Sequence, residues 1–339
     1  MAGLLQRLPA RAARLCLSVE QFLLRDLALP HPEGGFVLGV SGGADSTALL
    51  IFMCALAERW HAPLQAVHMD HGLRPESAAE ALHVQALCQR WQVPCTLVRE
   101  NVRQLAAEQG MGVEDAGRTA RYRAFEQVRQ HCGAQWIATG HHSGDLEEDV
   151  LLRLLRGAGW PALGGMPAVD AARHVTRPLL MTAPEDLRQM LREMREDWLE
   201  DASNASRDFR RNRLRHDVLP LLRQENPALR HGICELWRQA RADERHWAEL
   251  LRTALLCHPL RREGVLRIAD KALLAGLDAA LRPRLFRQIV QECGGQARAA
   301  TLHALDAAWC AGRGGARFQF PGGVTAQTHK GSVRFSPAP

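Results

Sequence analysis

Short apolar runs alternate with longer amphipathic or apolar segments through the first half of the chain. The short runs have the length of buried strands, and they lie at residues 36–41, 64–69, 95–98 and 136–139. The longer segments have helical length, and they lie at residues 47–57, 76–91, 114–131 and 146–155. Strands that alternate with helices of ten or more residues predict an α/β fold, with a parallel sheet covered on both faces.

The pattern changes after about residue 180. Residues 185–256 are nearly all of helical character and are rich in Arg, Leu and Glu, while residues 265–335 add a helix pair and a terminal segment that alternates Val and Phe with polar residues. The tail therefore predicts a small α+β domain. The expected parts are an N-terminal helix (1–34), an α/β domain (35–215), a helical, basic linker (216–260) and a small C-terminal domain (261–339).

Composition narrows the class of protein. The chain has 339 residues, of which 46% are hydrophobic and 24% charged, and this is typical of a globular protein. The longest purely apolar run, Ala48–Ala57, is about half the length of a membrane span, which excludes an integral membrane protein. Nine scattered cysteines with no Cys-x-x-Cys pair indicate free thiols, and we expect a cytoplasmic protein. The net charge of +6 favours polyanionic partners.

The clearest local signal is the loop after the first predicted strand, Gly-Val-Ser-Gly-Gly-Ala-Asp-Ser-Thr at residues 39–47. Its paired glycines permit a tight turn in which backbone N–H groups approach a ligand. Ser41 and Ser46 add hydroxyl groups, and the following helix N-terminus favours negative charge. The loop is therefore suited to a pyrophosphate, and Asp45 fits such a site if it holds Mg²⁺.

Two other interpretations of this loop are disfavoured. A Walker A loop needs Gly-Lys, but 41 of the 43 basic residues are arginine, and neither Lys271 nor Lys330 follows a glycine. Residues 39–43 also fit the Gly-x-Ser-x-Gly elbow of α/β-hydrolases. That elbow needs an earlier strand and loop to complete the oxyanion hole, whereas this motif ends the first predicted strand.

Ser-Gly-Gly-Ala-Asp-Ser at residues 41–46 resembles the PP-loop signature of N-type ATP pyrophosphatases, which have an adenine nucleotide α-hydrolase-like fold. Later motifs narrow the resemblance, and they lie at residues 68–74, 114–122, 138–142, 156–159, 177–180, 198–204 and 211–215. This ordered set is dense over residues 36–220, and it resembles the tRNA(Ile)-lysidine synthetases.

The resemblance implies an ATP-dependent ligase that forms a carbon–nitrogen bond on RNA. The 2-oxo oxygen of the wobble cytidine in tRNA(Ile) with a CAU anticodon attacks the α-phosphate of ATP and releases diphosphate. The side-chain amine of free L-lysine then displaces AMP, and the resulting lysidine switches codon reading from AUG to AUA. ATP and Mg²⁺ are the implied cofactors, and a homodimer is common in the family. The resemblance also implies that the C-terminal domain (261–339) contacts tRNA(Ile).

The same resemblance assigns site residues. The implied ATP-binding residues are Ser41, Gly42, Gly43, Ala44, Asp45, Ser46, His68 and Arg118, with Asp45 as the Mg²⁺ ligand through ATP. The implied catalytic residues are Asp45, Arg121, His141 and Asp145, and the implied lysine pocket is Asp145, Glu148 and Arg177. His68, Asp70 and His71 end a strand without an evident fourth ligand, so we expect a ligand-flanking turn there, not a stable metal site.

One motif departs from the family pattern. The usual sequence is His-His-x-Asp-Asp-x-x-Glu-Thr, whereas this chain has His-His-Ser-Gly-Asp-Leu-Glu-Glu-Asp at residues 141–149. Gly144 replaces the first acid and Asp149 replaces the threonine, so one carboxylate near the amine is missing. Glu147 and Asp149 are the candidate replacements.

Residues 207–230 hold seven arginines against three acids, a local excess of +4. One interpretation is a solvated basic helix, and the other is phosphate contact with tRNA, which the planar guanidinium group suits. The arginines that we expect to contact tRNA are Arg207, Arg210, Arg211, Arg213 and Arg215. Trp198 nearby fits either base stacking or the core.

Three other functions stay open at this point. A PP-loop tRNA thiolase generally needs paired cysteines, which this spacing does not offer. An amide ligase of the NAD- or GMP-synthetase type is disfavoured by the arginine-rich helical region, which favours an RNA substrate. A catalytically inactive RNA-binding module is disfavoured by the intact loop at residues 41–46, although Gly144 argues weakly for it.

Overall fold

A computed structural model describes residues 3–30, 32–70, 77–200, 207 and 210–337. Contacts divide the chain into two units, residues 1–158 with 162–237 and residues 159–161 with 238–339. The four-part division expected from the sequence stays a prediction, while these contacts place the boundary between Trp237 and Arg238.

The first unit is built on a six-stranded sheet with the order β3-β2-β1-β4-β6-β5. Its strands are β1 (Phe36–Gly39), β2 (Leu64–Asp70), β3 (Cys95–Arg99), β4 (Trp136–Ala138), β5 (Val169–Asp170) and β6 (Val175–Thr176). All neighbouring pairs are parallel except β5 with β6. Because β1 lies between β2 and β4, the chain crosses over in opposite directions on its two sides, and a ligand crevice is expected at its carboxyl end.

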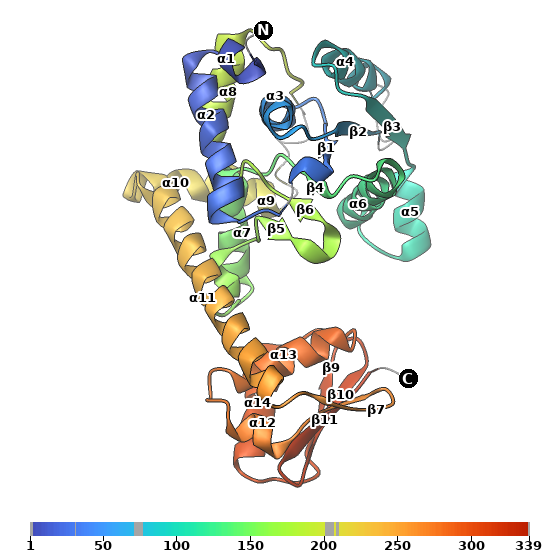
Figure 1. Cartoon of the computed structure of the whole chain (residues 1–339), viewed down its shortest axis with the longest axis vertical. Helices are drawn as coiled ribbons and strands as arrows, with labels where there is room; N and C mark the ends of the chain where they lie inside the picture. The colour runs from blue at the N-terminus through green and yellow to red at the C-terminus, as the bar shows by residue number, and fades with distance from the viewer. Residues whose placement is uncertain (1–2, 31, 71–76, 201–206, 208–209, 338–339) are drawn as a thin grey trace. The chain divides into compact units, whose positions relative to one another are not determined.

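Helices cover both faces of this sheet (Figure 1). The α-helices of the first unit are α1 (Leu4–Arg7), α2 (Ala10–Gln21), α3 (Ala44–Trp60), α4 (Ser77–Arg90), α5 (Val102–Gln109), α6 (Val113–Cys132), α7 (Ser143–Leu155), α8 (Pro184–Met194), α9 (Arg210–Arg213) and α10 (Leu219–Glu225). Short π- or 3₁₀-helical turns are η1 (Phe22–Asp26), η2 (Pro32–Gly34), η3 (Ala162–Gly164), η4 (Ala171–Arg173) and η6 (Leu214–Val218).

Alternation along β1 decides which helix packs on which face. Phe36 and Leu38 belong to the core that contains α3, whereas Val37 belongs to the core that contains Phe125 of α6. Helix α3 is apolar on all sides, and 13 of its 17 residues are buried. It is therefore the central helix of the unit, and its N-terminus is held against the carboxyl end of β1.

The predicted α/β fold is confirmed, and the predicted strands and helices of the first half lie within a few residues of the observed ones. The helical region predicted from residue 185 is interrupted at residues 195–200. Helix α8 ends at Met194 because Arg195 adopts a left-handed conformation with φ of 55°. The chain then runs on without helix through residue 200. Helix α5 was not predicted.

The second unit is the small α+β domain expected from the sequence. Its antiparallel sheet has the order β7-β8-β11-β10-β9. The strands are β7 (Arg261–Glu263), β8 (Leu266–Ala269), β9 (Arg317–Phe320), β10 (Val324–His329) and β11 (Ser332–Ser336), and the helices are α12 (Lys271–Ala275), α13 (Arg282–Glu292) and α14 (Ala299–Cys310). Helix α11 (Leu229–Cys257) contributes residues to both units. Its second part, with α12 to α14, packs on one face of the sheet around Phe286 and Phe335.

Within the described ranges, no helix combines the length and the apolar character that a membrane span requires.

Single substitutions on α3 and α4 test whether α3 lies in the core of the first unit. Phe52 of α3 is completely buried, so Phe52→Ala should lower the free energy of unfolding by about 3–5 kcal/mol, measured by chemical denaturation with circular dichroism. Leu82→Ala on α4, where the side chain is 67% exposed, should change it by less than about 0.5 kcal/mol. Equal effects of the two substitutions would contradict the assignment of α3 to the core.

Candidate active site

The loop between β1 and α3 is closed by its own serine side chains. The Ser46 hydroxyl accepts a hydrogen bond from the Ser41 amide at 3.1 Å and donates one to the Gly43 carbonyl at 3.0 Å. Gly42 has φ of +86°, a conformation that favours glycine. Since the first amides of α3 lack acceptors within the helix, the closed loop leaves them to bind an anion.

The end of β4 lies directly against the first turn of α3. A Cβ atom on Gly140 would lie 3.1 Å from the carbonyl carbon and oxygen of Asp45, so the close approach requires glycine here. The approach brings the two residues after Gly140, His141 and His142, beside the phosphate-binding loop. Parallel β1 and β4 thus deliver the loop and the histidines to one edge of the sheet.

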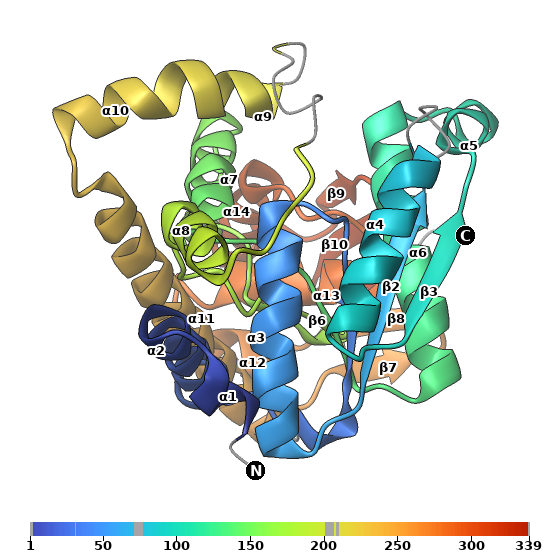
Figure 2. The same cartoon turned by 90° about the horizontal axis from the view of Figure 1, so that it is seen from above.

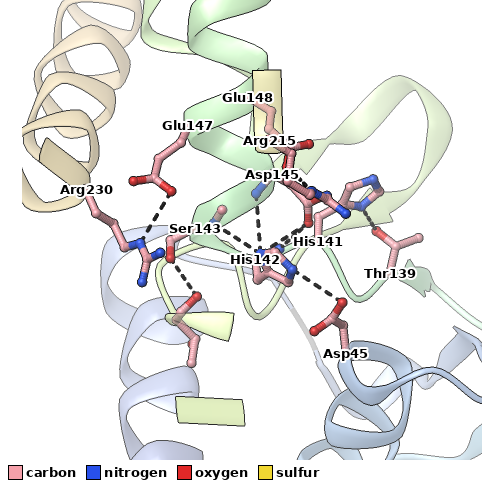
Figure 3. Close-up of polar contacts among 12 residues, drawn as sticks. Asp45, Thr139, His141, His142, Ser143, Asp145, Glu147, Glu148, Arg215 and Arg230 are labelled. Atoms are coloured by element: carbon pink, nitrogen blue, oxygen red, sulfur yellow. Dashed lines mark hydrogen bonds and ion pairs between the residues drawn. The ribbon is translucent and has the colours of Figure 1, made fainter. Parts of the chain in front are cut away.

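His142 connects the loop to helix α7 (Figure 3). Its Nδ1 accepts hydrogen bonds from the amides of Gly144 and Asp145 at 3.1 and 3.3 Å, and the Asp145 carboxylate accepts one from the His142 amide at 2.9 Å. This is a capping box in which histidine is the N-cap. Because Nδ1 accepts, the neutral ring carries its proton on Nε2, which lies 3.3 Å from the Asp45 carboxylate.

The sequence led us to predict a role for His141 but not the helix-capping role of His142. The signal was present, since His142 precedes a helix and Asp145 stands three residues later, as in a capping box. Burial lowers the pKa of His142, but the carboxylates of Asp145 and Asp45 raise it by more, so that it lies above the ordinary value.

Asp145 and Glu148 form an acidic pair on one face of α7. Their side chains are 12% and 2% exposed, and each accepts hydrogen bonds from two arginines of the 210–215 segment. Arg211 donates to Asp145 at 2.6 Å and also to Glu148, while Arg215 donates to Glu148 and, at 3.5 Å, to Asp145. Burial raises the pKa of Asp145, but the charges of His142 and Arg211 lower it to about 2. Asp145 is therefore ionised, and the two carboxylates of the pair bind cationic side chains.

The five arginines expected to contact tRNA do not share one direction. Arg211 and Arg215 turn to the acidic pair, and Figure 2 shows α9 and α10 lying across the end of α7. Arg207 pairs with Asp217 at 3.0 Å and its carbonyl accepts a hydrogen bond from Arg213, while Arg210 is exposed. Contact between these arginines and tRNA stays a prediction.

Glu147 and Asp149, the candidate replacements for the acid missing at Gly144, do not join the acidic pair of Asp145 and Glu148. Glu147 is completely buried and pairs with Arg223 of α10 and Arg230 of α11, while Asp149 pairs with Arg153 at 2.7 Å. A Cβ atom on Gly144 would lie 2.9 Å from Cε1 of the His142 ring, so an acid at this position would crowd the cap of α7. In this chain, the carboxylates beside the loop are therefore the two of the acidic pair, Asp145 and Glu148.

His141 and Arg177 lie beside the acidic pair. The Nδ1 atom of His141 is 2.8 Å from the Thr139 hydroxyl. Burial lowers the pKa of His141 to about 3; Asp145 opposes this effect, and Arg177, Arg211 and Arg118 add to it. His141 is therefore a neutral hydrogen-bonding group at physiological pH.

Arg177 is a buried cation of the same neighbourhood. Its side chain donates to the Pro167 carbonyl at 2.6 Å, and its Nε atom is buried with no hydrogen-bond partner among the described residues. Within that same part of the chain, no carboxylate pairs with Arg177. A buried cation without an acid partner is suited to an anionic substrate group.

The remaining predicted residues lie on α6 and β2. Arg118 and Arg121 have exposed side chains on α6, and the Arg118 guanidinium lies 5.1 Å from the centre of the Tyr122 ring. His68 is buried on β2, where Nδ1 lies 2.9 Å from the Val40 carbonyl and so supports the start of the loop. His71, the third residue of the disfavoured metal set, lies outside the described residues.

Asp45 fits a divalent cation. One of its carboxylate oxygens lies beside His142, and the other, Oδ1, is buried without a hydrogen-bond partner among the described residues. An unsatisfied carboxylate oxygen at the start of a phosphate-binding helix is the type of ligand that Mg²⁺ prefers. No group of three or more potential metal-ligating residues occurs in the described part of the chain, so Asp45 would need phosphate and water as further ligands.

The parallel sheet and the Ser-Gly-Gly-Ala-Asp-Ser loop at its switch point define a PP-loop protein, and the family model of the PP-loop domain matches residues 17–222. A tRNA(Ile)-lysidine synthase from Nitratidesulfovibrio vulgaris is 45% identical over 89% of this chain and 92% of its own length. Another, from Symbiobacterium thermophilum, is 34% identical over 94% of this chain and 68% of its own length. The chain belongs to the tRNA(Ile)-lysidine synthase family.

Family members differ in length relative to this chain. The chain spans 45% of the length of the Chromobacterium violaceum relative, at 43% identity. Among solved structures, the U34-tRNA thiolase NcsA from Methanococcus maripaludis, with its [4Fe–4S] cluster, matches at a TM-score of 0.54 and 16% identity over 68% of this chain and 78% of its own. This likeness supports the fold alone.

The pKa of His141 predicts a pH dependence of stability. The unfolded chain takes up a proton on His141 below its ordinary pKa of 6.5, whereas the folded protein does so only near 3. The fold should therefore lose about 2 kcal/mol through this residue as the pH falls from 6.5 to about 5. Asp145 adds nothing there, since its folded pKa is about 2 and its contribution is lost only below its unfolded value.

We expect His141→Asn to lose less unfolding free energy over this pH range than the unsubstituted protein, measured by urea denaturation at both pH values. An identical loss in both proteins would show that His141 titrates normally in the folded state.

Proposed function

We propose that this protein ligates free L-lysine to C2 of the wobble cytidine of tRNA(Ile) with a CAU anticodon, using ATP and producing AMP and diphosphate. The observation that carries the proposal is an arginine-binding acidic pair on α7 that His142 connects to the PP-loop. Asp45 of the loop contacts His142, and His142 caps the helix that bears Asp145 and Glu148. The 45% identity to a relative named tRNA(Ile)-lysidine synthase supports the same activity.

In the proposed first step, the loop and α3 bind the phosphates of ATP. Mg²⁺ held by Asp45 would neutralise part of the phosphate charge, while Arg118 and Arg121 of α6 approach from the facing side of the sheet's carboxyl edge. The O2 atom of the cytidine forms a bond to the α-phosphorus, and the bond to the β-phosphate oxygen breaks. His141 is neutral, so its role is to donate or accept a hydrogen bond at this site.

In the second step, the acidic pair holds the side-chain ammonium of lysine. The guanidinium groups of Arg211 and Arg215 contact the acidic pair where we place the lysine ammonium. Lysine therefore has to displace at least one of them. Asp145 is ionised in the structure, so its role is to hold and orient the amine. Arg177 is available for the α-carboxylate. The new C–N bond forms as the bond between C2 and the AMP oxygen breaks and a proton is released.

The charge distribution supports RNA contact by the second unit. Residues 238–339 carry a formal net charge of +8, whereas residues 1–237 carry −2. Strand pairing aligns Arg317 with Gln327, and Gln327 with Arg334, on the face of the sheet opposite the core. We propose that this face contacts the tRNA phosphate backbone.

The alternative functions are less well supported. None of the nine free cysteines is among the site residues described above, so the sulfur chemistry of a thiolase has no evident group here. A homodimer and a cytoplasmic location stay predictions.

The activity is tested with ATP, Mg²⁺, radiolabelled lysine and unmodified tRNA(Ile). We expect label in acid-precipitable RNA, lost with Asp45→Ala and lost when the wobble cytidine is changed. Asp145→Asn should keep tRNA-dependent diphosphate release but raise the KM for lysine by about tenfold or more, because a charged hydrogen bond to the ammonium is lost. Asp149→Asn on the same helix is the matched control and should resemble the unsubstituted protein.

The outcomes of this assay separate the candidates. Diphosphate release without label would indicate a different nucleophile in the second step. Absence of any ATP turnover would contradict the enzyme and leave an RNA-binding module.

The proposed tRNA surface predicts a change in salt dependence. Arg317→Ala with Arg334→Ala should weaken tRNA binding and reduce the slope of log K against log salt by about 2, one for each phosphate contact, measured by filter binding. Arg252→Ala on α11, where Arg252 pairs with Glu249, is the control and should leave the slope unchanged. An unchanged slope in the double variant would exclude this face.

A further inference from the structure

A non-helical segment after α8 lies across the phosphate-binding loop. Residues 196–200 follow α8, and we refer to them as the strap. Arg90 at the end of α4 pairs with Glu196 at 2.7 Å, and the Trp198 ring packs against the main core of the first unit. These anchors place Leu199, which lies in the 198–204 motif but was assigned no role from the sequence, directly on Gly42.

Leu199 contacts Gly42 in two ways. Its amide donates a hydrogen bond to the Gly42 carbonyl at 2.9 Å, and its side chain covers the α carbon of Gly42. A Cβ atom on Gly42 would lie 2.8 Å from the Leu199 Cδ1 atom. The φ of +86° favours glycine at position 42, and a larger residue there would also have to displace the end of the Leu199 side chain.

The amide bond of Leu199 controls the direction of a loop N–H. In a trans peptide the carbonyl and the next N–H point in opposite directions, so fixing the Gly42 carbonyl also fixes the Gly43 N–H. With that carbonyl held by the strap, the Gly43 N–H lies on the opposite side of the peptide and donates a long hydrogen bond to the Ser41 hydroxyl oxygen at 3.4 Å. A rotation of this peptide would instead present a carbonyl oxygen to the phosphates, which repels an anion.

We propose that Leu199 is a positioning residue for ATP, which fixes the Gly42–Gly43 peptide so that its N–H faces the diphosphate group. The proposal rests on the function proposed above, because it assumes that the loop binds ATP. The direct bond to Gly42 is the observation that distinguishes it from a general packing role, since Trp198 of the same strap contacts the core and its own Glu200 instead.

Two substitutions separate the amide from the side chain. Leu199→Pro removes the N–H, and Leu199→Ala keeps it but removes the contact over Gly42. For Leu199→Pro we expect about tenfold weaker binding of a non-hydrolysable ATP analogue with Mg²⁺, measured by calorimetry, because a hydrogen-bond donor to a charged group is misdirected. Leu199→Ala should weaken binding less, and Leu199→Ile should restore it. Asp197→Ala and Glu200→Ala are matched strap controls without a contact to the loop.

Binding of tRNA and thermal stability are measured on the same variants. We expect tRNA affinity to be unchanged in all of them and the midpoint of thermal unfolding to be unchanged in Leu199→Ala. Normal analogue binding by both Leu199→Pro and Leu199→Ala would overturn the proposal. Equal losses in Leu199→Ala and in the two control variants would also overturn it. If the unsubstituted protein itself fails to bind the analogue, the proposed function fails, which is a different result.

Discussion

The structure of the site depends on the capping of α7 by His142. One imidazole ring satisfies two orphan amides at the start of the helix through Nδ1 and contacts Asp45 of the phosphate-binding loop through Nε2. His142 therefore fixes the position of the phosphate-binding loop relative to the acidic pair on α7. Because the carboxylate of Asp145 also accepts the His142 amide, the residue that we expect to orient the amine is fixed by the same cap.

Arginine dominates the rest of the site because the helix α7 carries carboxylates on two faces. Asp145 and Glu148 are paired with Arg211 and Arg215, and the completely buried Glu147 is paired with Arg223 and Arg230. Buried carboxylates are tolerated only when their charges are matched, so these pairs hold the 210–230 segment on α7. In the proposed reaction, lysine would compete with the first set of ion pairs and not with the second, so the second set would keep the segment attached.

The two units differ in net charge, and we expect them to contribute differently to the proposed reaction. The first unit has a net charge of −2 and brings its phosphate-binding loop and acidic pair together through His142, where local geometry matters more than overall attraction. The second unit holds the basic excess of the chain, which suits long-range attraction of a polyanion. The strap that contacts Gly42 and the loop itself both belong to the first unit.

The sequence by itself determined the α/β class, the order of the main elements and the PP-loop, because strand and helix periodicity and glycine-rich turns are local properties. It also named Asp145, Glu148 and Arg177 through resemblance. Tertiary structure alone decided that Arg211 and Arg215 turn inward, that Glu147 and Asp149 do not replace the acid missing at Gly144, and that Leu199 lies on Gly42. These outcomes depend on which distant groups meet in space and on the cost of leaving buried charges unpaired, and neither is encoded in the spacing of residues along the chain.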